Sequence, residues 1–255
     1  MQKPDIPDIE GIPLVGLGTW NMFGKECART IAAAIDMGYR HLDTAQNYRN
    51  EKEVGEGVEL SGARRDELFI TTKVSTYNLE PSALEQSVQE SLEKLQTDYI
   101  DLLLIHWPTP DMDLEATLSA MFRLMAEGKI RKTGVSNFSP VLFREAISIG
   151  PVICNQVEFS PYIKQDDNLA VARDSDLVIT AHTPLGKGRA CKDPKLQQIG
   201  KKHGKTTAQV TLRWLLQHGN VSVIPKSSNM EHLQENFKVF DFKLTGDEMK
   251  MISDL

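Results

Sequence analysis

The chain has 255 residues, of which 40% are hydrophobic and 25% charged, and 29 Lys and Arg against 35 Asp and Glu give a formal net charge of −6. This composition is typical of a globular protein that buries a full core without disulfides or metals. An acidic balance without runs of Lys or Arg argues against nucleic acid as a partner. No apolar stretch reaches the roughly 18 residues that a membrane-spanning helix needs, so no membrane partner is expected.

The three cysteines, Cys27, Cys154 and Cys191, are odd in number and form no C-x-x-C motif. A disulfide framework is therefore not predicted, and a reducing compartment is expected. The first residues, MQKPDIPDIEG, carry Pro and acidic residues where a signal peptide has its apolar region. The sequence predicts a cytoplasmic protein.

Short apolar runs alternate along the chain with segments of helical periodicity. Residues 6–9 and 12–15, joined across Glu10 and Gly11, are compatible with a small hairpin before the first strand or merging into it. Eight strands are then predicted in chain order, at residues 14–17, 40–42, 68–72, 99–105, 132–135, 152–157, 177–181 and 221–224.

Helices are predicted between these strands by apolar residues at helical spacing. Examples are Leu84, Val88, Leu92 and Leu95 after Pro81, and Leu114, Leu118, Met121 and Met125. Ser139 followed by Pro140 predicts an N-cap and a first helical residue. Gly38, Gly128 and Gly204 lie where helices are expected to end, because glycine accepts the left-handed conformation of a C-terminal cap.

Strands that alternate with helices in this way imply a parallel sheet covered on both faces. Two α/β architectures compete, an open doubly wound sheet and a closed (β/α)8 TIM barrel. The number of strands and a length of about 250 residues favour the barrel. No linker-like segment interrupts the alternation, so residues 1–255 are predicted to form a single domain.

Polar residues follow the predicted strands at the end where a barrel carries its catalytic groups. Asp43 ends the second strand with Tyr48 soon after it, Lys73 ends the third strand, and His106 ends the fourth. Later strands end in further polar residues, namely Ser136, Asn137, Asn155, Gln156, Glu158, His182, Thr183, Lys226 and Ser227. Polar residues are common wherever loops begin, so no single one of them indicates a function. Asp43, Tyr48, Lys73 and His106 indicate a site only as a group.

These four residues have a coherent chemistry. The phenol of Tyr48 is too weak an acid to release its proton readily at neutral pH. An ammonium about 4 Å away contributes about 4 kcal/mol at an effective dielectric near 20, which lowers the pKa of a phenol by about three. Lys73 could supply that charge, Asp43 could hold Lys73, and His106 could orient a substrate oxygen. The group therefore predicts a general acid beside a carbonyl, with a contribution of roughly 10²–10⁴ in rate.

A proton donor for a carbonyl oxygen needs a hydride donor for the carbonyl carbon. The glycine pairs at 16 and 18, 55 and 57, and 186 and 188 all lack the third glycine of a G-x-G-x-x-G fingerprint, which disfavours a Rossmann site. A barrel can instead bind phosphate with its last loops and a helix N-terminus. The segment I-P-K-S-S-N at 224–229, followed by a helical pattern, fits such a site and fits an ordinary capped helix equally well.

Seven motifs in chain order together resemble the aldo-keto reductase family. They are G-L-G-T-W at 16–20, D-T-A-Q-N-Y at 43–48, I-T-T-K at 70–73, L-I-H-W-P at 104–108, G-V-S-N-F at 134–138, N-Q-V-E at 155–158 and I-P-K-S at 224–227. Through N-Q-V-E-F-S-P-Y at 155–162 the chain is most similar to the bacterial 2,5-diketo-D-gluconate reductases. The resemblance implies a monomeric (β/α)8 reductase that uses NADP(H), with NAD(H) open as a second cofactor. It also implies that Asp43, Tyr48, Lys73 and His106 are the catalytic tetrad.

The resemblance implies further roles at matching positions of this chain. Ser136, Asn137 and Gln156 would bind the nicotinamide carboxamide, and His182, Thr183 and Leu185 would lie along the cofactor after the seventh strand. Lys226, Ser227 and Asn229 would surround the 2′-phosphate, and His232, Glu235 and Asn236 would lie at the adenine. Trp20 and Trp107 would line the substrate pocket, although aromatic residues are as often plain core.

Three departures from the family pattern modify these expectations. His182 stands where the family usually has a stacking Tyr, and an imidazole offers less area and can be charged, so weaker cofactor binding is expected. His232 stands where the family commonly has Arg, which softens the expected preference for NADP(H) over NAD(H). The chain stops at Leu255, before the loop that covers the pocket in relatives, so an open pocket with loose substrate selection is expected, unless the sequence is truncated.

The leading functional hypothesis is a carbonyl reductase of broad specificity that acts without a metal. Its substrates would be small polar aldehydes, α-dicarbonyls or keto sugars such as 2,5-diketo-D-gluconate. A non-catalytic relative that binds nucleotide as a sensor or partner subunit is the alternative, although the intact tetrad argues against it. A metal-dependent barrel hydrolase is disfavoured, because His41, His106 and His182 come without an H-x-H motif or a bridging carboxylate.

Overall fold

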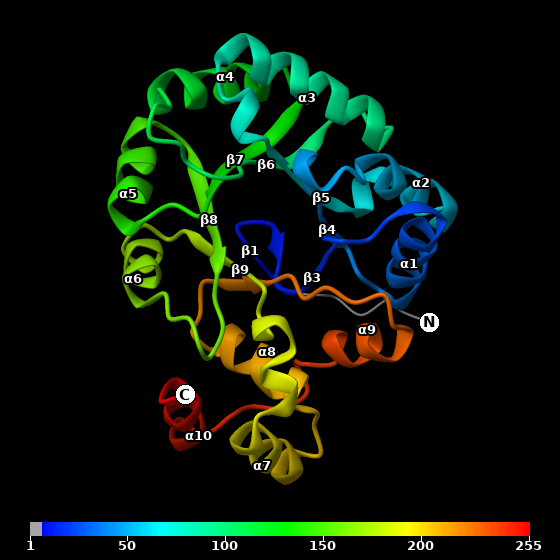
Figure 1. Cartoon of the computed structure of the whole chain (residues 1–255), viewed down its shortest axis with the longest axis vertical. Helices are drawn as coiled ribbons and strands as arrows, with labels where there is room; N and C mark the ends of the chain where they lie inside the picture. Colours follow the sequence, from blue (N-terminus) through cyan, green and yellow to red (C-terminus); the bar gives the residue numbers. More distant parts are fainter. Residues whose placement is uncertain (1–6) are drawn as a thin grey trace.

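The computed structural model describes residues 7–255 and has a sheet of eight parallel strands at its centre (Figure 1). In chain order these strands are β3 (Gly16–Gly18), β4 (His41–Asp43), β5 (Phe69–Val74), β6 (Ile100–Ile105), β7 (Ile130–Ser136), β8 (Val152–Glu158), β9 (Val178–His182) and β10 (Val221–Val223). Each strand pairs with its neighbour in the sequence. A parallel bridge between Val15 and Val223 joins the two edges of the sheet.

This strand order confirms the α/β class and the (β/α)8 barrel, and the open doubly wound alternative is wrong. A doubly wound sheet reverses its strand order at a switch point. Here the strands follow one another in sequence order from β3 to β10, with no reversal. The predicted strands match the observed ones to within about two residues, which is the usual uncertainty of strand ends.

Helices surround the sheet, as Figure 1 shows. They are α1 (Gly24–Met37), α2 (Glu51–Ser61), α3 (Pro81–Leu95), α4 (Leu114–Ala126), α5 (Pro140–Ile149), α6 (Asp166–Asp174), α7 (Pro194–His203), α8 (Thr207–Gln217), α9 (Met230–Phe237) and α10 (Gly246–Ser253). None of the helices within residues 7–255 combines the length and the apolar character needed to cross a membrane.

The predicted helix signals form as expected. The side chain of Ser139 accepts a hydrogen bond from the backbone N–H of Leu142, with Pro140 at the first position of α5. Gly38 caps α1 in the left-handed region at a φ of 116°, and Gly204 caps α7 in the same region. Gly128 follows the cap of α4 by one residue. The four predicted apolar positions of α3 are all buried, so that face packs on the barrel.

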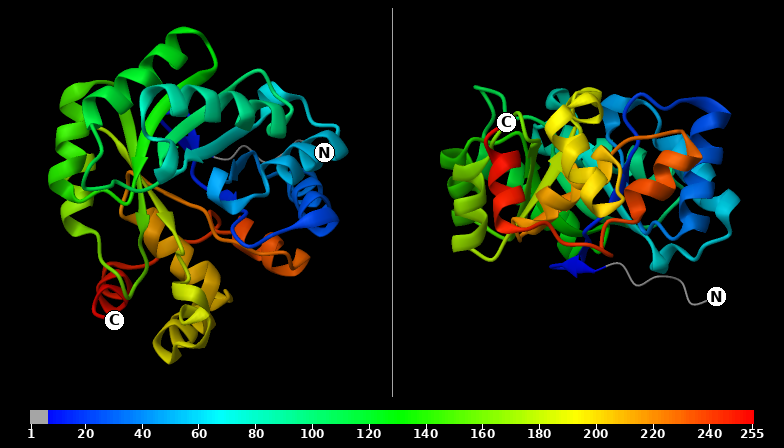
Figure 2. Two further views of the ribbon diagram at one scale, coloured as in Figure 1. Left: turned by 45° about the horizontal axis from the view of Figure 1, so that its top comes forward. Right: turned by 90° about the horizontal axis from the view of Figure 1, so that it is seen from below.

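One end of the barrel is closed by a hairpin of β1 (Asp8–Ile9) and β2 (Ile12–Pro13). Figure 2 shows this hairpin, in dark blue, at one end of the barrel in its right-hand view. Ile12 is fully buried there in a cluster that includes Phe69, Leu102 and Val178. The predicted hairpin therefore exists, although its second strand ends at Pro13 and the start of the first, at residue 6, lies outside the described residues.

The opposite end of the barrel carries polar side chains, because alternate residues of a strand point the same way. Asp43 lies opposite Thr71 on the neighbouring strand, and Lys73 follows two residues later on the same face. Ser136 and Gln156 pair in the same way across β7 and β8. The hairpin and the apolar cluster around Ile12, here called the apolar plug, fill one end of the barrel. The functional site is therefore expected at the opposite end, where the strands end in polar residues and which is called the upper end below.

The apolar plug gives the first prediction. Ile12→Ala should lower the free energy of unfolding by about 2–5 kcal/mol, because it leaves a cavity in a fully buried cluster. Urea unfolding followed by circular dichroism measures this. Val141→Ala, at a position 78% exposed, is the control and should change stability by no more than about 0.5 kcal/mol. If Ile12→Ala were as mild as this control, the hairpin would not be part of the core.

Candidate active site

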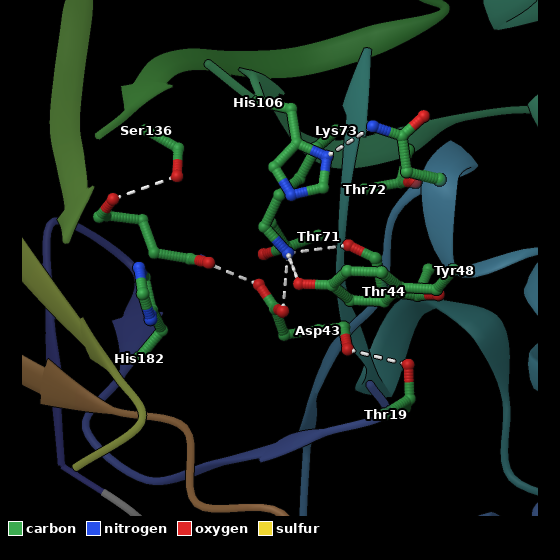
Figure 3. Close-up of polar contacts among 12 residues, drawn as sticks. Thr19, Asp43, Thr44, Tyr48, Thr71, Thr72, Lys73, His106, Ser136 and His182 are labelled. Atoms are coloured by element: carbon green, nitrogen blue, oxygen red, sulfur yellow. Dashed lines mark hydrogen bonds and ion pairs between the residues drawn. The ribbon is translucent and has the colours of Figure 1, made fainter. Parts of the chain in front are cut away.

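Four side chains from three neighbouring strand ends meet at the upper end of the barrel (Figure 3). Asp43 is the last residue of β4, Lys73 lies near the end of β5, and His106 follows β6. Tyr48 comes from η1, a 3₁₀ turn at Gln46–Tyr48 that follows β4. The structure thus brings together the four residues that the sequence singled out as a group.

Lys73 and Asp43 form a buried ion pair at the base of the site. Both residues are almost completely buried, and Lys73 Nζ donates to Asp43 Oδ1 at 2.6 Å. Lys73 Nζ also donates to the backbone oxygen of Thr44 at 2.8 Å, and Gln156 Nε2 donates to Asp43 Oδ2 at 2.7 Å. Charges can be held in a low-dielectric interior when they are paired and hydrogen-bonded in this way.

Tyr48 receives the third contact of the lysine. Lys73 Nζ donates to the phenol oxygen of Tyr48 at 3.4 Å, so the phenol keeps its own proton for another acceptor. Burial raises the pKa of Tyr48, and the positive charge of Lys73 lowers it by a smaller amount. The expected net lowering of the Tyr48 pKa is therefore wrong, because the desolvation of the phenolate outweighs the attraction to the ammonium.

The ammonium itself stays charged. Burial alone lowers the pKa of Lys73, but the charge of Asp43 and the contact with Tyr48 act in the opposite direction and together leave it raised. At neutral pH the site therefore holds a charged Lys73 beneath a protonated Tyr48.

His106 stands edge-on to Tyr48, with ring centroids 5.5 Å apart and planes at 77°. Burial, followed by repulsion from Lys73, lowers the pKa of His106 to about 4, so its ring is neutral at physiological pH. The Nδ2 group of Asn47 donates to His106 Nδ1 at 3.5 Å. The other ring nitrogen, Nε2, lies on the side of Tyr48 and Lys73 in Figure 3.

A cavity of about 300 Å³ lies above these groups. Its lining includes most of the predicted site, namely Asp43, Tyr48, His106, Ser136, Asn137, Gln156, His182, Thr183, Lys226, Trp20 and Trp107, while Lys73 lies buried beneath it. Trp20 and Trp107 are 61% and 51% exposed, so both indoles flank a mouth that is open to solvent. Among the described residues, none beyond Lys226 lines this cavity.

Ser136, Asn137 and Gln156 form a hydrogen-bonded cluster on one wall. Ser136 Oγ donates to the backbone oxygen of Gln156 at 2.8 Å. Asn137 Nδ2 donates to Ser136 Oγ and to the backbone oxygen of His106, both at 3.0 Å. Because Gln156 Nε2 binds Asp43, its Oε1 remains an acceptor with no partner among the described residues. This wall can therefore bind an amide.

His182 is fixed by both of its ring nitrogens. Its Nε2 donates to Asn137 Oδ1 at 3.0 Å, and its Nδ1 accepts from Thr183 Oγ1 at 3.1 Å. Burial, followed by repulsion from Lys73, lowers the pKa of His182 to about 4. The ring is therefore neutral at physiological pH. The sequence had left open a positive charge on His182, and the lowered pKa excludes it.

The residues predicted around the far end of a nucleotide do not line the cavity. These are Leu185, Ser227, Asn229, His232, Glu235 and Asn236. Asn229 caps α9 by accepting from the backbone N–H of His232, and Ser227 Oγ accepts from the backbone N–H of Asn229. Asn236 is buried, and its Oδ1 has no hydrogen-bond partner within residues 7–255. Lys226 connects the two regions, because it also lines a neighbouring hollow of about 200 Å³ with Ser228.

Some residues at the site escaped the sequence analysis. Asn47 contacts His106, and Lys187 lines the cavity from η4 (Gly186–Gly188) with a left-handed φ of 55°. A cation between two glycines is a signal that could have pointed to Lys187. Asn47 lies within the D-T-A-Q-N-Y motif, but the motif does not reveal its contact with His106. Pro184 also lines the cavity, together with Gly18, Glu158 and Ile224, which belong to sequence motifs described above.

The three histidines of the hydrolase hypothesis do not lie in one site, because His106 and His182 line the cavity and His41 does not. His41 is buried in the barrel, where its Nε2 is 3.0 Å from Thr71 Oγ1. Across residues 7–255 no three His, Cys, Asp or Glu side chains form a group that could hold a metal ion. These residues therefore offer no metal-binding cluster that would support a metal-dependent hydrolase.

Known proteins resemble this chain over nearly its whole length. The family model of the aldo/keto reductase family matches residues 14–255. Methylglyoxal reductase DkgB of Escherichia coli O157:H7 is 40% identical over 96% of this chain and 93% of its own. Glyoxal reductase of Bacillus subtilis is 41% identical over 96% and 89%. A crystal structure assigned as a 2,5-diketo-D-gluconic acid reductase B has 43% identity and a TM-score of 0.94, and it covers 96% of this chain and 88% of its own.

The buried histidines predict a loss of stability in mild acid. Burial lowers the pKa of His41, His106 and His182 from 6.5 to about 4. Below pH 6.5 the unfolded chain therefore binds protons that the folded chain rejects. The free energy of unfolding should fall as the pH drops from about 6.5 towards 4.

Urea unfolding at pH 7.5, 6.0 and 5.0 measures this fall. His106→Gln combined with His182→Gln removes two of the groups, so its unfolding free energy should depend less on pH than that of the wild type. Equal pH dependence in the two proteins would show that these histidines are not neutral in the fold.

Proposed function

The chain belongs to the aldo/keto reductase family and is an oxidoreductase, and from this premise we propose that it reduces small aldehydes and α-dicarbonyls to alcohols with NADP(H). The observation that carries the proposal is the position of the Tyr48 hydroxyl. It lies in an open cavity, 3.4 Å from Lys73 Nζ, which in turn is paired with Asp43.

The proposed chemistry follows from this arrangement. The carbonyl oxygen of the substrate binds between the hydroxyl of Tyr48 and Nε2–H of His106, and both polarise the C=O bond. NADP(H), when bound, supplies the hydride for the carbonyl carbon. Tyr48 gives its proton to the oxygen, so the oxygen ends as a hydroxyl. Asp43, Tyr48, Lys73 and His106 are thus the proposed catalytic tetrad.

Lys73 and Asp43 act on the phenolate that remains. A phenol with a raised pKa keeps its proton throughout the physiological range, so the donor is always loaded. The same burial that raises the pKa makes the phenolate unstable by itself. The Lys73 ammonium stabilises that phenolate at the moment it forms, and Asp43 keeps the ammonium in place and charged.

The wall of Ser136, Asn137 and Gln156 fits the carboxamide of a nicotinamide. Gln156 Oε1 can accept from the amide nitrogen, and the hydroxyl of Ser136 and the amide of Asn137 lie beside it. His182 offers a neutral ring, held by two hydrogen bonds, for contact with the nicotinamide. The weaker cofactor binding expected from His in place of Tyr at this position stays a prediction.

The α9 end of the site fits the adenosine half of the cofactor. Lys226 and Ser227 precede the N-terminus of α9, where a phosphate group is favoured. The buried Asn236 Oδ1 lacks a hydrogen-bond donor in the described part of the chain, and an adenine amino group is such a donor. Glu235 and Asn229 lie on the same helix and its cap, and Leu185 and Thr183 lie in the loop after β9.

Substrate selection is proposed to be broad. The exposed indoles of Trp20 and Trp107 offer flat apolar walls without a fixed polar contact. The relatives include a methylglyoxal reductase and a glyoxal reductase, both named for small dicarbonyls. Small aldehydes, α-dicarbonyls and keto sugars such as 2,5-diketo-D-gluconate are therefore the proposed substrates, and a monomer is the proposed assembly.

Turnover assays test the proposal. Purified protein should oxidise NADPH in the presence of methylglyoxal or 4-nitrobenzaldehyde. A protein that binds NADPH, shown by quenching of tryptophan fluorescence, but turns over neither substrate would instead be a nucleotide-binding sensor.

Tyr48→Phe removes only the proton donor, so it should reduce kcat by roughly 10²–10⁴. The dissociation constant of NADPH should stay within about twofold of wild type, because Tyr48 is proposed to contact substrate and not the nucleotide. Steady-state kinetics with methylglyoxal and fluorescence titration measure the two quantities. Unchanged kcat in Tyr48→Phe would remove Tyr48 from the mechanism.

His232 predicts a modest preference for NADPH over NADH. Histidine lacks the permanent charge and bidentate geometry of arginine, so the ratio of the two kcat/KM values should stay below about a thousandfold, or about 4 kcal/mol. His232→Arg should raise this ratio through a lower KM for NADPH. A ratio already above a thousandfold in the wild type would show that Lys226 and Ser227 suffice for selection.

A further inference from the structure

Asn47 is a polar neighbour of His106 to which the proposed reaction assigns no role. Its Nδ2 group lies 3.5 Å from His106 Nδ1, on the ring edge away from Nε2. We propose that Asn47 is a positioning residue that fixes the tautomer of His106, so that Nε2 carries the proton and donates it to the substrate oxygen in a hydrogen bond.

The tautomer matters because the ring is neutral. A neutral imidazole has one N–H and one lone pair, and an imidazolium would donate from both nitrogens without any control. The groups that face the ring favour the neutral form, because Lys73 from β5 and His182 from β9 oppose a positive charge, and burial acts in the same direction. Asp43 from β4 acts against them but is already paired with Lys73.

The wrong tautomer would oppose the reaction. With the proton on Nδ1, the lone pair of Nε2 would face the carbonyl oxygen as negative charge develops on it. The ring would then repel the charge that it is proposed to stabilise. A donor that keeps Nδ1 unprotonated therefore ensures that Nε2 carries the proton and can donate to the substrate oxygen.

Asn47 is well placed to exert this control. Among the described residues no other side chain makes a hydrogen bond to Nδ1 of His106. A backbone N–H from two residues further along the chain is not available, because that residue is Pro108. The Asn47 amide is therefore the group that we infer to control Nδ1.

The turn that carries Asn47 is anchored by its neighbour Gln46. Gln46 Oε1 accepts from the backbone N–H of Ser75 at 2.9 Å, and Gln46 Nε2 donates to Ser87 Oγ at 3.0 Å. The backbone N–H of Tyr48 closes the turn on Ala45 at 3.0 Å. These bonds join η1 to β5 and α3, so the Asn47 amide is held on a fixed support.

Aspartate at position 47 is a nearly isosteric test. A carboxylate can only accept, so Asn47→Asp should draw the proton to Nδ1 and leave a lone pair on Nε2. Asn47→Ala removes the contact and should leave the two tautomers mixed. Gln86→Glu is the charge-matched control, because Gln86 is an exposed residue of α3 that lines neither the cavity nor the neighbouring hollow.

The tautomer is read directly by nitrogen-15 NMR of the histidine ring, in protein without substrate, with His106→Gln used to assign the signal. The expected result is a protonated Nε2 in the wild type and in Gln86→Glu, and a protonated Nδ1 in Asn47→Asp. A protonated Nδ1 in the wild type, or the same tautomer in wild type and Asn47→Asp, would overturn the inference.

Kinetics give the second readout, and this part of the inference rests on the proposed function. Asn47→Asp should lower kcat for methylglyoxal at pH 7.5 by about 10²–10³, the usual effect of losing one donor to a developing oxyanion. The loss should shrink as the pH falls, because the carboxylate favours the imidazolium, which again donates from Nε2. Asn47→Ala should lose less than Asn47→Asp, and Gln86→Glu should match the wild type.

The two readouts separate the possible failures. Absence of turnover in the wild type would contradict the proposed reductase while the NMR result stands by itself. Wild-type kcat in Asn47→Asp, despite a changed tautomer, would show that His106 does not donate from Nε2 and would overturn the positioning role.

Discussion

The site depends on one buried ion pair. Lys73 and Asp43 sit at adjacent strand ends with 2.6 Å between Nζ and Oδ1, and almost no solvent reaches either. A pair at this depth adds little to stability by itself, so its value lies in what it positions. Lys73 holds the phenol oxygen of Tyr48, and Asp43 binds Gln156 on the opposite side of the barrel. One interaction therefore connects the proton donor to the wall proposed for the nicotinamide.

The barrel makes this pair possible. Parallel strands bring their carboxyl ends to one rim, so Asp43, Lys73 and His106 converge although more than 60 residues separate the first from the last. The hairpin of β1 and β2 closes the other end with apolar side chains, which keeps water from reaching the pair from below. The barrel also buries most of the His106 and His182 rings at its polar end, which lowers the pKa of both and leaves them neutral.

The sequence was sufficient for the architecture and for the residues at the strand ends, because both depend on local periodicity. The sequence could not predict whether burial or a neighbouring charge has the larger effect on the pKa of one side chain. The lysine beside Tyr48 predicted a lowered pKa, but burial outweighs the charge, and burial is known only when all strands are in place. His182 was a poor substitute for tyrosine by sequence, whereas the structure shows both ring nitrogens in use. Asn47 lies within the D-T-A-Q-N-Y motif, but its proposed role could not be predicted from the sequence, because that role depends on the contact with a histidine 59 positions away.

The account is tested most directly by the rate of reduction without the buried cation. In Lys73→Met, NADPH bound in advance should reduce methylglyoxal in a single turnover at a rate lower than wild type by a factor of at least about 10². The phenol would still be present, but the phenolate would form without its counter-charge. A wild-type rate in a folded Lys73→Met protein would show that the ion pair does not support the proton donor, and the account given above would be contradicted.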